Sequence, residues 1–96
     1  MKKIDRTWVL EQINAGITEI TIPNGVEMIE AYAFKDCTTL TSITLSDSLT
    51  SIGEFAFFQC TSLTSITLPD GITSIGKFAF FNCTALTSMT LPDSLT

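Results

Sequence analysis

The pattern of apolar and polar positions repeats every 23 residues along most of the chain. Residues 63–85, LTSITLPDGITSIGKFAFFNCTA, are identical to residues 40–62 at 17 of 23 positions and to residues 17–39 at 10 of 23 positions. Residues 86–96 begin a fourth unit and cover about half of it. A fixed period of this length is typical of a solenoid, in which each repeat packs on its neighbour and equivalent positions form columns. The sequence therefore predicts one continuous stack of repeats.

Each repeat is predicted to begin with a short strand. In the segment L-T-S-I-T-L of the central repeat, Leu63, Ile66 and Leu68 are expected to face the core, whereas Ser65 and Thr67 alternate outward. Successive strands would align in one parallel sheet, and the P-D-G that follows would end the strand because proline cannot continue the ladder. The segment I-T-S-I-G predicts a second short extended stretch. The segment K-F-A-F-F-N-C is long enough for one helical or 3₁₀ turn.

Residues 1–16 do not fit the repeat and predict an N-terminal cap helix. Asp5 is a candidate N-cap, residues 6–14 contain good helix formers, and Ala15-Gly16 supplies a stop. The apolar residues of this segment are spaced i, i+4 and form a stripe that could cover the open end of the first repeat: Ile4 with Trp8, and Val9 with Ile13. Trp8 is the expected main anchor, with a binding role for it as the alternative.

The charge of the chain argues against nucleic acid as a partner. Five Lys and Arg residues stand against ten Asp and Glu residues, for a net charge of −5, and the basic residues cluster nowhere beyond the N-terminus. No apolar run is long enough to insert into a membrane, and the N-terminus lacks the apolar segment of a secretory signal. These features predict either a cytoplasmic chain or a fragment of a longer exported protein.

The three cysteines, Cys37, Cys60 and Cys83, are spaced by one repeat and therefore form one column. The rung spacing of about 4.8 Å would allow a disulfide between neighbours. Their odd number and apolar surroundings favour three small buried side chains instead. A metal site is not expected, because the chain has no histidine and no CxxC pair.

Catalytic chemistry is not expected. The chain has no histidine, a single arginine in the N-terminal segment, and no glycine-rich phosphate motif, so neither an enzyme nor a cofactor site is predicted. One turn column carries Asn24, Asp47, Asp70 and Asp93. Asx turns explain this column better than a cation site, since no D-x-D pattern supplies further oxygens.

The repeat pattern L-x-x-I-x-L-P-x-x-(I/L)-x-x-I-G-x-x-A-F-x-x-C over residues 17–96 resembles the BspA-like class of leucine-rich repeat found in bacterial surface proteins. Its Ala-Phe pair and cysteine recur at fixed offsets, as Ala33-Phe34 with Cys37, Ala56-Phe57 with Cys60, and Ala79-Phe80 with Cys83. The resemblance implies an α/β repeat solenoid with a parallel sheet on its concave side. It also implies a non-enzymatic adhesion or protein-binding role and a cell-surface or secreted location.

The chain departs from the family pattern at two positions. The residue before cysteine, often glycine in the family, is Asp36, Gln59 or Asn82, which should preserve the turn because Asn and Asp tolerate its geometry. The first repeat has Glu30 where later repeats have Gly53 and Gly76, so a looser bend is expected there.

Three surfaces are candidate binding sites. The concave strands present two polar columns, which either keep the sheet soluble or bind a protein partner: Glu19, Ser42, Ser65 and Ser88, and Thr21, Thr44, Thr67 and Thr90. The aromatic residues that flank the Ala-Phe pairs cannot all point inward, so they either stack between rungs or form an exposed patch: Tyr32, Phe55 and Phe78, and Phe58 and Phe81. The last strand could form an edge for self-association through Leu86, Met89, Leu91 and Leu95.

The leading functional hypothesis is a non-catalytic protein-binding module that uses the concave face and the aromatic residues. The alternative is a structural unit that forms homo-oligomers through its C-terminal rung.

Overall fold

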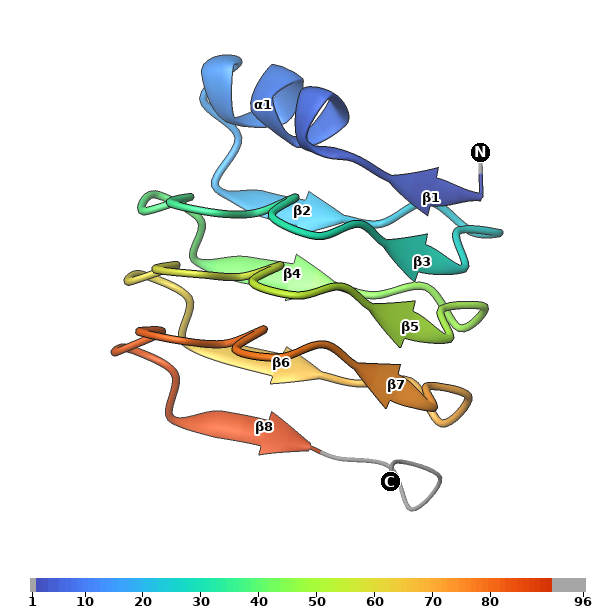
Figure 1. Ribbon diagram of the computed structural model, residues 1–96. Coiled ribbons are helices and arrows are strands. Elements are labelled where there is room, and N and C mark those ends of the chain that lie inside the picture. Colours follow the sequence, from blue (N-terminus) through green and yellow to red (C-terminus); the bar gives the residue numbers. More distant parts are fainter. Residues whose placement is uncertain (1, 91–96) are drawn as a thin grey trace.

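A computed structural model describes residues 2–90 of the chain as a solenoid with an N-terminal helix and two parallel sheets. Successive 23-residue rungs lie one below another, and each contributes one short strand to each sheet (Figure 1). This is the repeat solenoid that the sequence pattern predicts.

The first sheet has the strand order β2-β4-β6-β8 and carries the predicted polar columns. Its strands are β2 (Glu19–Thr21), β4 (Ser42–Thr44), β6 (Ser65–Thr67) and β8 (Ser88–Thr90). Equivalent residues pair in register, for example Thr21 with Thr44 and Ser65 with Ser88. The central isoleucines of β2, β4 and β6 are buried and the flanking threonines are exposed, so the predicted alternation is confirmed for these strands.

The second short extended segments also form a parallel sheet, with the order β1-β3-β5-β7. These strands are β1 (Lys3–Ile4), β3 (Met28–Ile29), β5 (Ser51–Ile52) and β7 (Ser74–Ile75). The sequence predicts only a cap helix for residues 1–16, so β1 was not expected. Lys3 pairs with Met28 and Ile4 with Ile29, and Ile4 is fully buried, so the N-terminus supplies the first strand of this sheet.

Helix α1 (Arg6–Asn14) lies over the open end of the first rung (Figure 1). Asp5 is its N-cap, as predicted, and its carboxylate accepts a hydrogen bond from the Trp8 N–H at 2.9 Å. Trp8 and Ile13 pack half-buried against the core, and Val9 is the fully buried residue of the helix. Ile4 belongs to β1, so the predicted pairing of Ile4 with Trp8 on the helix does not form.

Arg6 gives the cap a polar function that the sequence did not reveal. Its guanidinium donates hydrogen bonds to the carbonyl oxygens of Tyr32 at 3.0 Å and Lys35 at 2.9 Å. Phe58 is the equivalent of Lys35 in the next rung, and its carbonyl accepts a hydrogen bond from the Asp36 N–H of the rung before it, at 2.7 Å. At Lys35 no rung precedes, and the Arg6 guanidinium supplies this hydrogen bond instead.

The return segment of each rung is a series of tight turns, so the prediction of a helical or 3₁₀ turn there is wrong. In the first rung, Ala33 and Cys37 donate to carbonyls three residues earlier, whereas Phe34 donates to Ala56 of the next rung. A 3₁₀ turn would direct consecutive N–H groups along its own axis. Here every second N–H group donates to a carbonyl of the next rung instead, so main-chain hydrogen bonds connect the rungs along this segment too.

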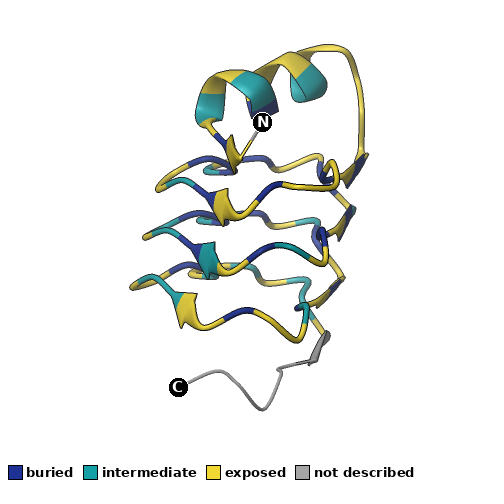
Figure 2. Cartoon of the chain, turned by 90° about the vertical axis from the view of Figure 1, so that its right-hand side faces the viewer, coloured by how far each residue is buried: buried dark blue, intermediate teal, exposed yellow. Residues whose placement is uncertain are grey.

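The core consists of columns that run through the stack. Buried and exposed residues alternate along each rung, and the buried residues recur at equivalent places in successive rungs (Figure 2). The rings of Phe34 and Phe57 stack at 4.8 Å between centroids, and those of Phe57 and Phe80 at 5.2 Å. Such a continuous core allows 23-residue units to be stable although none can bury its apolar face alone.

Threonines add a second set of links between rungs. Thr41 donates both its N–H, at 2.8 Å, and its hydroxyl, at 3.1 Å, to the carbonyl oxygen of Thr18 one repeat earlier. Thr64 donates in the same two ways to the carbonyl oxygen of Thr41, and Thr87 to that of Thr64, each one repeat earlier. These hydroxyls are therefore part of the structure rather than of a free polar surface.

The glycines at positions 53 and 76 are required by a close approach between rungs. A Cβ atom on Gly53 would lie 2.5 Å from the Ala31 nitrogen, and one on Gly76 would lie 2.4 Å from the Glu54 nitrogen. Glu30 comes directly after β3 and stacks on the end of β1, where its N–H donates to the Ile4 carbonyl at 2.9 Å. Its carboxylate forms an ion pair with Lys3 at 2.8 Å. The glutamate thus replaces glycine where the preceding element leaves space, which explains this departure better than a looser bend.

Candidate functional site

The aromatic residues that flank the core form two columns along the turn side of the stack, here called the aromatic columns. Tyr32, Phe55 and Phe78 make one, and Phe58 and Phe81 make the other. Within the columns, Tyr32 and Phe55 stack at 5.3 Å between centroids and Phe58 and Phe81 at 5.5 Å. The two columns touch edge to face, at 5.4 Å between Phe55 and Phe58. The structure thus brings all five predicted aromatic residues together.

The sequence left open whether these rings stack between rungs or form an exposed patch. In the structure the rings stack on one another and are still partly exposed. Tyr32, Phe78 and Phe81 are 43%, 48% and 46% exposed. A small apolar cleft of about 90 Å³ lies between Phe55, Phe78 and Phe81. Contiguous exposed aromatic area of this kind marks interaction surfaces more often than scattered apolar residues do.

One aromatic column stands on strained backbone. Tyr32, Phe55 and Phe78 have φ values of 64°, 56° and 57°, in the left-handed region that favours glycine. Each is the third residue of a turn closed by an i to i+3 hydrogen bond, for example from the Ala33 N–H to the Glu30 carbonyl at 3.2 Å. That combination is a type II turn, whose third residue is normally glycine or asparagine. Asp36, Gln59 and Asn82, the residues before the cysteines, also have positive φ, and the turn is preserved there as predicted.

Two lysines lie at the ends of the aromatic columns. The Lys35 ammonium is 5.8 Å from the centroid of the Tyr32 ring, and the Lys77 ammonium is 5.4 Å from that of Phe78. Both distances are within the range of cation–π attraction. The first and last rings of this column therefore each have one of the protein's own cations near them.

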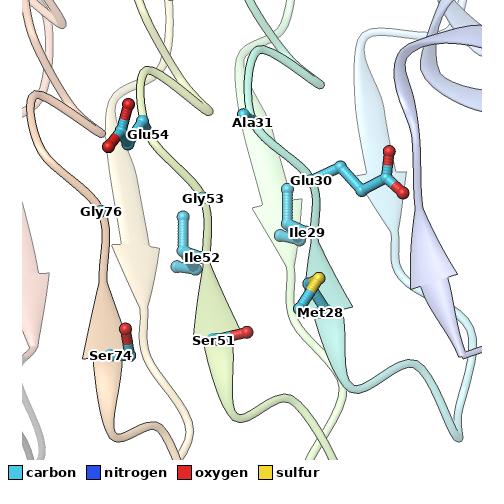
Figure 3. A pocket seen from close by; sticks show the side chains of 10 residues that line it. All are labelled: Met28, Ile29, Glu30, Ala31, Ser51, Ile52, Gly53, Glu54, Ser74 and Gly76. Atoms are coloured by element: carbon cyan, nitrogen blue, oxygen red, sulfur yellow. The ribbon is translucent and has the colours of Figure 1, made fainter.

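A groove of about 460 Å³ runs across three rungs beside β3, β5 and β7 (Figure 3). Figure 3 shows the strand side chains on one side, the turn residues on the other, and the glycines between them. The lining residues are Met28, Ile29, Glu30, Ala31, Ser51, Ile52, Gly53, Glu54, Ser74 and Gly76. The groove was not predicted from the sequence, because the close approach of the rungs at Gly53 and Gly76 is not encoded in any local pattern.

The polar columns of the first sheet lie on its outer face. Glu19, Ser65, Thr21, Thr44 and Thr67 are exposed and Ser42 is half-buried. The backbones of Ser88 and Thr90 continue the two columns on β8. None of these residues lines the groove, so this polar face and the groove are separate surfaces.

The cysteine column is part of the core. Cys37 and Cys60 are buried and Cys83 is half-buried. The thiols of Cys60 and Cys83 donate to the carbonyl oxygens of Phe34 and Phe57, each at 3.0 Å, in the preceding rung. Burial raises the pKa of Cys37 to about 11. The neighbouring Cys83 thiol and burial together raise the pKa of Cys60.

Within residues 2–90, no three metal-binding side chains come close enough to hold an ion. The turns of the acidic column are closed by the main chain, through bonds from Val26 to Pro23, Leu49 to Ser46 and Ile72 to Pro69. In the second turn, the hydroxyls of Ser46 and Ser48 also donate to the Val26 carbonyl, at 2.8 and 3.0 Å. Asp93 lies outside the described residues.

The predicted self-association edge is described only in part. Leu86 is half-buried against the core, and the backbone of Met89 lies in β8. Leu91 and Leu95 lie outside the described residues. Among the described helices none is long and apolar enough to cross a membrane.

Comparison with known proteins gives a family match over most of the chain. Residues 12–96 match the family model of the BspA type Leucine rich repeat region, with six copies. No curated protein matches the chain significantly.

Three solved structures of bacterial leucine-rich repeat proteins are similar to the chain. A leucine rich cell surface protein from Faecalibacterium prausnitzii is 41% identical over 76% of the chain, with a TM-score of 0.73. A leucine-rich repeat protein from Eubacterium ventriosum is 37% identical over 81% of the chain, with a TM-score of 0.77. A leucine-rich repeat protein from Bacteroides ovatus is 33% identical over 88% of the chain, with a TM-score of 0.51. The chain spans 19%, 21% and 28% of the lengths of these proteins, respectively.

Proposed function

The chain belongs to the BspA-type leucine-rich repeat family, and on this basis we propose that it is a non-catalytic module that binds another protein at a bacterial cell surface. The observation that carries the proposal is the pair of exposed aromatic columns. The cell-surface part rests on the description of the similar Faecalibacterium protein.

The exposure of the aromatic columns supports a docking role. Aromatic side chains are enriched at protein interfaces, where a few of them supply most of the binding free energy. Tyr32, Phe78 and Phe81 combine with the cleft beside Phe55 into one apolar surface across three rungs. A partner with an apolar projection would fill that cleft.

The strained backbone supports the same role. A left-handed conformation disfavours any residue with a Cβ by about 1–2 kcal/mol, and glycine would avoid this at Tyr32, Phe55 and Phe78. Strain of this kind is concentrated at functional sites. An aromatic residue in all three rungs is therefore better explained by the surface it forms than by the turn.

The stacking geometry favours a protein over a nucleic acid or a sugar. Bases stack on aromatic ring faces, and sugar rings pack against such faces in the same way. The faces of Tyr32, Phe55 and Phe78 are turned toward one another or lie beneath Lys35 and Lys77. Exposed ring edges suit contact with apolar and aromatic side chains instead.

Binding to immobilised purified extracellular proteins, measured by biolayer interferometry, tests the proposal. The Phe78→Ser/Phe81→Ser double variant should bind at least tenfold more weakly than the unchanged chain to any panel member that the chain binds, because truncated interface anchors typically weaken binding by about this factor or more. A Thr44→Ala/Thr67→Ala double variant on the first sheet serves as the matched control, and circular dichroism checks that both fold.

Two outcomes would contradict the proposal. Failure of the unchanged chain to bind any panel protein would count against a binding module. Loss of binding in the threonine variant with full binding in the aromatic variant would place the contact on the polar face of the first sheet.

A further inference from the structure

We propose that the groove beside β3, β5 and β7 receives a lysine or arginine side chain from an extended segment of the protein partner. The inference rests on the proposed function, because the same partner would contact the aromatic columns. The inference adds that the partner's segment next to the aromatic columns carries a basic residue.

The shape and lining of the groove suit a long, unbranched side chain. Its volume of about 460 Å³ is within the range of ligand sites in proteins. Met28 and Ala31 are exposed and provide apolar contacts, and no side chain projects from Gly53 or Gly76 between them. Lysine and arginine pack their methylene stems on apolar surface while the charged group stays near water.

The charged groups in the lining are both carboxylates. Glu30 forms the ion pair with Lys3, whereas Glu54 is exposed and forms no ion pair within residues 2–90. Lys77 follows Gly76 in sequence, but its ammonium lies over the Phe78 ring. With a net charge of −5 on the whole chain, the groove presents negative charge to a partner. A guanidinium or ammonium group is the complementary ligand for Glu54.

The groove and the aromatic columns form one continuous surface. Ala31 and Glu54 line the groove, and the next residues along the chain, Tyr32 and Phe55, belong to the aromatic columns. The hydroxyls of Ser51 and Ser74 on the opposite wall provide hydrogen-bonding groups for a partner's main chain. A segment with a basic residue beside apolar ones would therefore contact the groove and the columns together.

Amide chemical shifts of the ¹⁵N-labelled chain provide the test. The probe is a blocked five-residue peptide with a central arginine flanked by alanines, and its twin has glutamine at the centre. We expect the arginine peptide to move the amide signals of Gly53, Glu54 and Gly76 in a saturable way, and the glutamine twin to leave them unchanged. Glu54→Gln should weaken binding of the arginine peptide by up to about fivefold, the upper end for one solvent-accessible ion pair. Glu19→Gln, which changes the net charge equally on the other sheet, should have no effect.

Equal shifts from the two peptides would overturn the inference, as would unchanged affinity in Glu54→Gln or shifts confined to the first sheet. The outcome is independent of the aromatic test. If Phe78→Ser/Phe81→Ser abolishes binding to a panel protein and Glu54→Gln has no effect on the peptide, the proposed function stands and the groove inference fails.

Discussion

The identity of many residues in this chain follows from what lies one rung away. Gly53 and Gly76 face the backbone of the preceding rung, whereas Glu30 faces β1 and retains a side chain. Cys60 donates its thiol proton to a main-chain carbonyl 26 residues earlier. Residue choice is therefore set by the stack as well as by local conformation, and single substitutions can separate the two effects.

Replacement of Gly53 by alanine tests the close approach between rungs. The new Cβ would lie 2.5 Å from the Ala31 nitrogen, so Gly53→Ala should lower the free energy of unfolding by about 1–3 kcal/mol, the usual effect of overpacking. Gly71→Ala is the control, because its Cβ would meet nothing closer than 3.9 Å and the equivalent residue in the previous rung is Ser48. Urea unfolding should show a change within about 0.5 kcal/mol for the control. Equal stability of the two variants would refute the requirement for glycine.

A second substitution pair tests the strained aromatic column. At Phe55, with φ of 56°, a glycine variant should be more stable than an alanine variant by about 1 kcal/mol, because glycine adopts the left-handed conformation without penalty. At Phe58, where φ is not positive, the order should reverse, since glycine loses more backbone entropy than alanine. Thermal unfolding of the four variants measures both differences. Alanine as the more stable residue at both positions would show that the backbone strain is absent.

The buried thiol of Cys37 predicts a dependence of stability on alkaline pH. Its pKa is raised from an ordinary value of 9.0 to about 11, so between these values the unfolded chain releases the proton and the folded chain keeps it. The stabilisation from the neutral thiol is complete below pH 9 and is lost as the pH rises toward 11. The difference in Tm between the unchanged chain and Cys37→Ala should stay constant up to about pH 8.5 and then shift against the unchanged chain. A difference that does not vary with pH would show that this thiol titrates normally.

At the scale of elements, the regular parts could be predicted from the sequence and the irregular ones could not. Alternation in L-T-S-I-T-L located the strands of the first sheet, and Asp5 located the start of α1. The return segment was misassigned because its length suits a helical turn, and the alternate hydrogen bonds to the next rung involve partners 22 residues away. Strand β1 was missed because two residues show no periodicity. The aromatic residues could be identified as a group from their columns, whereas the groove depends on a close backbone approach that no local pattern encodes.

The role of α1 as a cap can be tested within the helix itself. Val9 is fully buried against the first rung, and its neighbour Leu10 is 37% exposed. Val9→Ala should lower the free energy of unfolding by about 1–3 kcal/mol through lost burial, whereas Leu10→Ala should lower it less, because Leu10 already contacts water. Urea unfolding of the two variants measures the contrast. A larger effect at Leu10 would mean that the helix packs through another face.

At the scale of the whole molecule, the chain is a short array that presents three different surfaces on one core. The first sheet offers polar columns, the second borders a groove with two carboxylates, and the turn side carries the aromatic columns. In a solenoid each side chain of a surface recurs with the rung spacing, so binding area grows with the number of rungs. The similar bacterial proteins are several times longer than this chain, and the proposed surface could extend along arrays of that length.

The central claim, that the aromatic columns are the docking surface, is tested most directly by mapping the contact on the intact chain. Amide signals of the ¹⁵N-labelled protein would be recorded alone and with the panel protein that binds it most tightly. The account predicts that the largest changes fall on Tyr32, Phe55, Phe78 and Phe81, with little change at Thr21, Thr44 and Thr67. The largest changes on the threonines, with unaffected aromatic residues, would contradict it.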